Sequence, residues 1–212
     1  MTDPILKAIP TNLARELAEY ALLQAELAEA LNAFTLWFDR YAARDKESLP
    51  PDEKLISQAL FRDSLVMFVG CFDGNQAVKL YPSDVYSDAN RSLSYFAWLK
   101  DIRDSYAAHK FGPFRQCVIG VTVDKSDKVT GVGRKTRVYA GFVPAGRDDV
   151  LSMIRMAGRF VNKKVRDLSE QVMAEAKTMS PAELAALKTA ETFDVEPHEV
   201  RLTRRRFRRG GS

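Results

Sequence analysis

Arg103 and His109 are the two side chains of this 212-residue chain whose types and spacing could do chemistry together. They lie six positions apart in the segment LKDIRDSYAAH, residues 99–109. A neutral imidazole with a pKa near neutrality can take a proton from a hydroxyl group. A guanidinium can hold two oxygens of one phosphate group. The pair therefore has the chemistry needed to cleave a phosphodiester.

RNA cleavage without a metal ion needs a base for the 2′-hydroxyl, an acid for the leaving 5′-oxygen, and positive charge beside the phosphorus. Six positions along an ideal helix turn the chain by about 600°, which places Arg103 and His109 on different faces. We therefore expect the helix to end or distort before His109, or a second subunit to complete the pocket. Asp104 is placed to orient His109 or its symmetry mate.

The spacing resembles the R-x4–6-H signature of the HEPN superfamily, which is seen in all-helical ribonucleases of toxin–antitoxin and antiphage systems. The resemblance rests on residues 99–109 and extends, through compatible helical patterns, to about residues 11–190. It implies a metal-independent endoribonuclease without a cofactor, a homodimer that pairs its motifs across a two-fold axis, and a role in bacterial defence. It implies that Arg103, His109 and Asp104 are catalytic, and we expect Tyr106 and Lys110 to contact the substrate.

Two other interpretations remain open. Arg103 and His109 could be a surface arginine and a histidine near a helix C-terminus, where the helix dipole favours a cation. The chain would then be a non-catalytic helical module that binds a protein partner or a nucleic acid. Alternatively, the chain is an antitoxin-like partner whose β-hairpin adds to another protein's sheet.

Other common functional motifs are missing from the sequence. It contains no Walker loop, no GxGxxG between a strand and a helix, no His-Glu-x-x-His and no nucleophile elbow. The two cysteines, Cys71 and Cys117, lie in apolar surroundings, and we expect both to be buried, reduced thiols. No cluster of histidines and carboxylates has the spacing of a metal site, so we expect no metal.

The elements that must position the motif are mostly helices. A helix is predicted over residues 11–44, because apolar residues recur every three or four positions. Further helices are predicted from residues 52–53 to the turn at Asp73-Gly74, and over about residues 89–109 before the break at Gly112-Pro113. The first seam comprises Leu13, Leu17, Tyr20, Leu27, Leu31, Phe34, Phe38 and Tyr41, widened by Leu22, Leu23, Leu36 and Trp37.

In the second half of the chain, the spacing of apolar residues changes from that of helices to that of strands, and later returns to that of helices. Two β-branched runs around a polar turn predict a β-hairpin at about residues 116–143, which alone would be marginal and must lie on the helices or pair with another chain. A long helix is predicted after Asp148-Asp149, and a short one after the Ser180-Pro181 cap. The fold class is therefore mainly α: a HEPN-like helical bundle over residues 1–193 with an inserted hairpin.

Charge and hydropathy suggest a soluble cytoplasmic protein without a membrane partner. Residues 1–4 carry an acid, unlike a signal peptide, and the longest uninterrupted apolar stretch, near residues 65–72, is shorter than a membrane span. The net charge is +4, but six arginines after residue 200 contribute +6, so residues 1–200 carry −2. We expect residues 194–212 to form a basic, partly disordered arm, which is either solubilising or able to attract nucleic acid through Arg204, Arg205, Arg206, Arg208 and Arg209.

Overall fold

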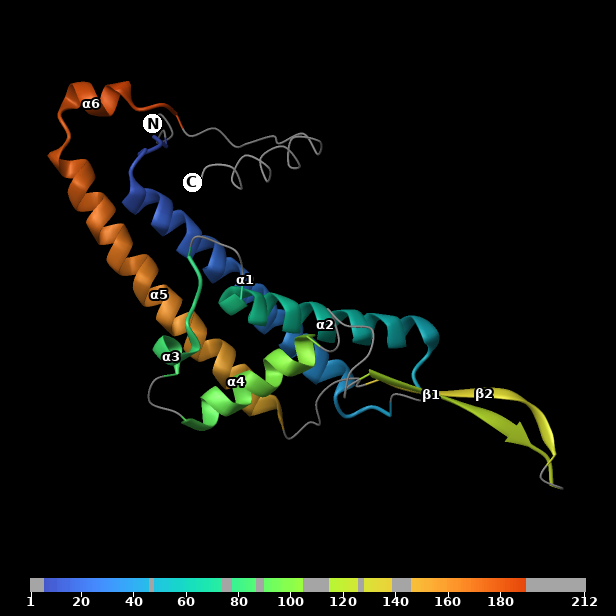
Figure 1. Ribbon diagram of the computed structural model, residues 1–212. Helices are drawn as coiled ribbons and strands as arrows, with labels where there is room; N and C mark the ends of the chain where they lie inside the picture. Colours follow the sequence, from blue (N-terminus) through green and yellow to red (C-terminus); the bar gives the residue numbers. More distant parts are fainter. Residues whose placement is uncertain are drawn as a thin grey trace, which may run out of the picture. The chain divides into compact units, whose positions relative to one another are not determined.

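The structure is a computed structural model that describes residues 6–45, 48–73, 78–86, 90–104, 115–125, 128–138 and 146–189 (Figure 1). In chain order the elements are α1 (Asn12–Tyr41), α2 (Pro51–Asp73), α3 (Pro82–Val85), α4 (Asn90–Arg103), β1 (Arg115–Val123), β2 (Val129–Val138), α5 (Arg147–Thr178) and α6 (Pro181–Ala186). The chain divides into two compact units. One is Asn12–Val172, and the other joins Met1–Thr11 to Met173–Ser212.

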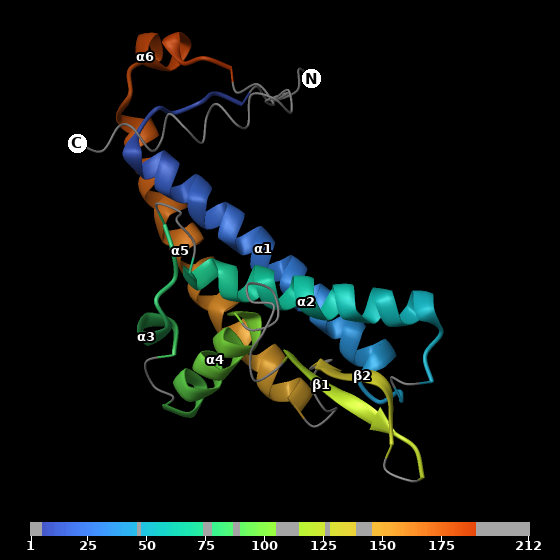
Figure 2. The same ribbon diagram turned by 45° about the vertical axis from the view of Figure 1, so that its right-hand side comes forward.

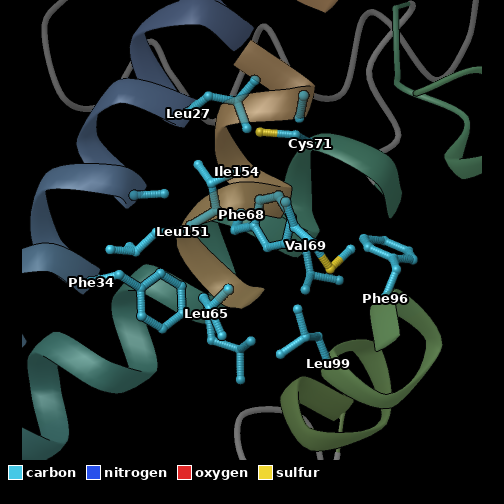
Figure 3. Packing of buried hydrophobic residues seen from close by; sticks show 14 of the residues in the cluster. Leu27, Phe34, Leu65, Phe68, Val69, Cys71, Phe96, Leu99, Leu151 and Ile154 are labelled. Carbon is cyan, nitrogen blue, oxygen red and sulfur yellow. The ribbon is translucent and has the colours of Figure 1, made fainter. Parts of the chain in front are cut away.

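The core of the larger unit is built from four helices, α1, α2, α4 and α5, which both views show gathered together (Figures 1 and 2). Figure 3 shows Phe34 of α1, Phe68 of α2, Leu99 of α4 and Ile154 of α5 directed into the same interior. Each of these four side chains is buried. Burying a large apolar side chain contributes about 1.5–3 kcal/mol, so this shared interior fixes how the helices pack.

α1 buries the stripe that its sequence predicts, with one difference. Leu27, Phe34 and Tyr41 are buried, as are Leu23 and Trp37, which widen the seam. Leu22 and Leu36, expected to widen it further, lie on the exposed side of the helix. Because successive residues point about 100° apart around a helix, Leu22 and Leu36 are turned away from the interior that buries Leu23 and Trp37.

α2 begins at Pro51, the second residue of the Pro50-Pro51 pair. Asp52 and Glu53 lie in its first turn, where the helix dipole stabilises negative charge. α2 is the one helix among the described residues that is long and apolar enough to cross a membrane, with a mean hydropathy of 1.4. Its uninterrupted apolar stretch is short because Arg62 and Asp63 interrupt the run, and for this reason the length of that stretch did not indicate the helix. Eight of its residues are buried, which is typical of a core helix in a soluble protein.

Two buried polar groups are satisfied inside this core. Trp37 Nε1 of α1 donates a hydrogen bond to the Ser57 hydroxyl of α2 over 3.1 Å. The Tyr86 hydroxyl, just after α3, donates to the carbonyl oxygen of Met153 in α5 over 3.3 Å. Since a buried polar group without a partner is destabilising, these two bonds also fix the register between the helices.

The β-hairpin predicted at about residues 116–143 is present as an antiparallel pair of strands, with residues 139–145 outside the described chain. The register places Val121 opposite Val132 and Ile119 opposite Arg134, so these four residues share one face. Ile119, Val121 and Val132 are 63–77% exposed, so the described helices do not cover this apolar face.

The smaller unit contains α6 and the start of the chain. Ser180 caps α6 by accepting a hydrogen bond from the Glu183 backbone, and the Glu183 side chain accepts one from the Ser180 backbone. This reciprocal pair confirms the cap that the sequence predicts. Lys7 forms an antiparallel bridge with Thr189, and its Nζ donates to the carbonyl oxygen of Leu187 over 2.9 Å.

The mainly α prediction is confirmed, including the four long helices and the hairpin. The helix expected over residues 89–109 is described only as far as Arg103, because residues 105–114 lie outside the described chain. The basic arm predicted over residues 194–212, with its five arginines Arg204, Arg205, Arg206, Arg208 and Arg209, also lies outside it.

Candidate functional site

Asp73, Lys100 and Arg103 form an ion cluster where α2 and α4 both end. Lys100 Nζ donates a hydrogen bond to Asp73 Oδ1 over 3.0 Å. A terminal nitrogen of the Arg103 guanidinium donates to the other carboxylate oxygen, Oδ2. One carboxylate at the end of α2 therefore holds two cations from the last turn of α4.

The packing of α4 fixes the position of Arg103. Phe96, Leu99 and Ile102 point into the core and are almost completely buried. Arg103 follows Ile102, so its Cα is held close to the interior, and only 17% of its side chain is exposed. Lys100 is 42% exposed and lies one turn before Arg103 on the same side of the helix. The guanidinium is therefore a fixed group rather than a mobile surface charge.

Asp104 provides a second carboxylate for Arg103. Its Oδ1 lies 2.7 Å from Arg103 Nε. The Nε atom is buried and the pair does not have the geometry of a hydrogen bond, so the contact between the two groups is electrostatic. Arg103 thus lies between Asp73 and Asp104, and the four charges of the cluster, including Lys100, cancel.

The helix dipoles of α2 and α4 act differently on the carboxylate and on the two cations of this cluster. Asp73 is the last residue of α2, at the carbonyl end of the helix dipole, where a negative charge is unfavourable. The hydrogen bonds from Arg103 and then from Lys100 outweigh this and lower the pKa of the Asp73 carboxyl below its ordinary value. Lys100 and Arg103 in turn lie in the last turn of α4, where cations are favoured. The Asp73 carboxyl is therefore ionised at neutral pH.

Arg103 and Asp104 are the two residues of the predicted catalytic set that the structure describes. The third catalytic residue, His109, lies in residues 105–114, outside the described chain, as do Tyr106 and Lys110, which were predicted to contact the substrate. α4 is described as far as Arg103, six positions before His109. Sequence reasoning missed Asp73, which it used only as a turn signal, because a contact across 30 residues leaves no local pattern.

A separate polar contact lies between α2 and α1. The Cys71 thiol is fully buried, 3.3 Å from the carbonyl oxygen of Met67 and 3.7 Å from Oε2 of Glu26 in α1. Burial first, and the charge and hydrogen bond of Glu26 next, raise the pKa of Cys71 to about 12. The thiolate is the reactive form of cysteine, so Cys71 is an inert core residue, as its apolar surroundings predict.

Comparisons with known proteins find no matching family model, no matching curated protein and no matching solved structure. The chemistry of Arg103 and its neighbours is therefore the basis on which a function can be inferred.

Proposed function

We propose that this chain is a HEPN-like helical endoribonuclease in which Arg103 orients the scissile phosphate and His109 takes the proton from the 2′-hydroxyl. The 2′-oxygen then attacks the phosphorus, the bond to the 5′-oxygen breaks, and a 2′,3′-cyclic phosphate is formed. The protonated His109 gives its proton to the leaving 5′-oxygen. Asp104 serves as the positioning residue. Asp73 joins it as a second carboxylate that fixes the guanidinium.

The observation that carries this proposal is that Arg103 is held in a fixed orientation at the end of α4. A guanidinium that is 17% exposed and held by the Asp73 carboxylate keeps one orientation. It lies immediately before the segment that contains His109. Electrostatic catalysis depends on donors that are already oriented when the charge develops, and this arrangement supplies one.

The proposal includes a dimer, because the resemblance implies paired motifs and because the hairpin has an uncovered apolar face. Ile119, Val121 and Val132 lie together on that face and are all exposed. Contact between two copies through these side chains would remove them from water. Substituting Val121 and Val132 with Lys is expected to shift the chain toward a monomer in analytical ultracentrifugation.

The test of the proposed activity is cleavage of a labelled single-stranded RNA with EDTA present. Arg103→Ala and His109→Ala are each expected to reduce the rate by about 100- to 1,000-fold, the loss seen when an oriented donor is removed. Arg15→Ala removes an exposed arginine of α1 and serves as the matched control. Circular dichroism verifies that the variants fold. Activity that persists in both variants would overturn the assignment.

A second function is favoured by one specific observation. Arg103 already has two carboxylates, Asp73 and Asp104, beside it, which neutralise it as a phosphate ligand. This favours a non-catalytic helical module that binds a protein or a nucleic acid, an antitoxin-like partner among them. Such a module would show no cleavage at any pH, and if the arm is responsible it would lose binding when residues 201–212 are removed.

A further inference from the structure

The exposed side of α5 carries a row of four cations. Arg155, Arg159, Lys163 and Arg166 are four, four and three residues apart, which places them on one face of the helix. All four side chains are exposed. At 1.5 Å per residue, the row is about 16 Å long. We call these four residues the α5 basic face.

The core holds this face in a fixed direction. Val150, Ala157 and Val161 lie on the opposite side of α5 and are completely buried in the larger unit. The apolar stripe of α5 is thus fully used for packing, and the α5 basic face is turned outward by the same contacts. In Figure 1 this part of the helix is the segment beside α3 and α4.

The cations of this row are not neutralised by the rest of the described chain. Arg155, Arg159 and Lys163 form no ion pair with any described residue. Arg166 has only its neighbour Asp167, at 3.7 Å between two largely exposed groups, which is a weak interaction. This contrasts with Arg103, whose carboxylates lie in direct contact, and with the net charge of −2 over residues 1–200. A row of four cations with one weak ion pair, on a body that otherwise carries a small net negative charge, is where a polyanion would bind.

We propose that the α5 basic face binds the phosphate backbone of a nucleic acid. Three of its four cations are arginines, which hold phosphate oxygens through a planar fork. The exposed polar residues Ser152, Asn162 and Ser169 border the row and the exposed Glu170 follows it. Between Val150 and Val172, α5 exposes no large apolar side chain that would insert into a lipid bilayer. The apolar side of α5 is not available for insertion either, because it lies in the core. The site does not depend on the proposed cleavage at Arg103.

The test compares two variants of the full chain that lose the same charge. One replaces Arg155, Arg159, Lys163 and Arg166 by glutamine. The control replaces four exposed cations outside α5 by glutamine, namely Arg15, Arg40, Lys79 and Lys128. Binding to a fluorescein-labelled 20-nucleotide RNA, and to a DNA duplex of the same sequence, is measured by fluorescence anisotropy between 50 and 200 mM salt as an assay range.

The α5 variant is expected to bind the RNA about 100-fold more weakly at low salt, and the slope of log Kd against log salt should fall by about 3, because each phosphate contact contributes about 0.7–0.9. The control variant should retain most of the affinity and slope. If the α5 variant loses affinity for the DNA duplex and not for the RNA, the result supports the same site and identifies duplex DNA as its ligand. Equal losses in both variants would show an effect of net charge alone and would overturn the proposal.

Two further measurements complete the test. Binding to phosphatidylserine vesicles without binding to either nucleic acid would overturn the proposal in favour of a membrane surface. Arg103→Ala separates the two proposals, because it removes a single phosphate contact and should weaken RNA binding far less than the α5 variant does, even if it has lost cleavage. Retained RNA binding in the α5 variant with cleavage lost in Arg103→Ala would overturn the binding face and leave the proposed activity standing.

Discussion

The carboxylate of Asp73, at the end of α2, accepts a hydrogen bond from the guanidinium of Arg103, at the end of α4. The two residues are 30 positions apart in the sequence, yet each is the last residue of its helix. The pair therefore joins two helix ends at the point where the chain enters the segment with His109. Whatever residues 105–109 do, they start from a position that this ion pair fixes.

Removing the Asp73 charge is expected to alter how stability depends on pH. The pKa of Asp73 is lowered by Arg103 and Lys100, so the ionised form stabilises the fold above the pKa of the unfolded chain, about 4. This stability is lost as the pH falls through the lower pKa of the folded state. Wild type should exceed Asp73→Asn by about 0.5 kcal/mol at pH 6, a small value because the groups are partly exposed. Urea unfolding between pH 3 and 6 measures it, and a difference that does not change with pH would contradict the prediction.

The buried thiol of Cys71 should resist modification in the folded chain. Burial is the main reason that its pKa is raised to about 12, so little thiolate is present at pH 8. In a Cys117→Ser background, which leaves one thiol, DTNB is expected to react only after urea is added. Glu26→Gln removes the smaller electrostatic cause and should leave the thiol protected. Rapid reaction of the native chain would show that the site is open to solvent.

Phe68 of α2 should be among the most costly side chains to truncate. It is completely buried and packs edge-on against Phe72 and Phe96, so Phe68→Ala leaves a cavity between α2 and α4. The free energy of unfolding is expected to fall by about 3–5 kcal/mol. Leu55→Ala, on the exposed side of the same helix, is the matched control and should change it by less than about 0.5 kcal/mol. Chemical denaturation measures both, and equal losses would contradict the packing described for α2.

Replacing Gly158 in α5 by alanine should stabilise the fold. Gly158 lies in the helix interior, and no atom would lie within 4 Å of an added Cβ. Gly158→Ala should therefore raise the free energy of unfolding by about 0.5–1 kcal/mol, because alanine loses less backbone entropy in a helix. Gly131, whose Cβ would lie 3.3 Å from the Thr122 hydroxyl oxygen, is the contrasting position where no gain is expected. A lower midpoint for Gly158→Ala in urea would count against this geometry.

The helices could be predicted because their signals are local. The three- and four-residue spacing of apolar side chains predicted α1 and α5, and the buried residues Phe34, Ala157 and Val161 lie on that stripe. Proline and acid signals predicted where α2 and α6 begin. Which of two adjacent residues such as Leu22 and Leu23 is buried depends on the positions of the other helices, and periodicity alone does not give these positions.

The candidate site was predictable only in part, because its contacts are not local. Arg103 was identified from its spacing to His109, but its partner Asp73 belongs to another helix and is found only once α2 and α4 pack together. The α5 basic face did have a sequence signal, cations at positions 155, 159, 163 and 166 opposite an apolar stripe. The net charge of −2 over residues 1–200 does not reveal it, because acidic residues elsewhere cancel the charge of the row.

The bridge between Lys7 and Thr189 makes the order of one terminus depend on the other. α6 has six residues and buries none of them, which is too short for a helix to be stable by itself. Its support comes from the Ser180–Glu183 cap and from backbone contact with the start of the chain, where the Ala8 amide donates to Lys188 over 2.9 Å. Proteolytic trimming of the first eight residues, or a bulky tag fused there, would therefore let α6 fray about 175 positions away along the chain.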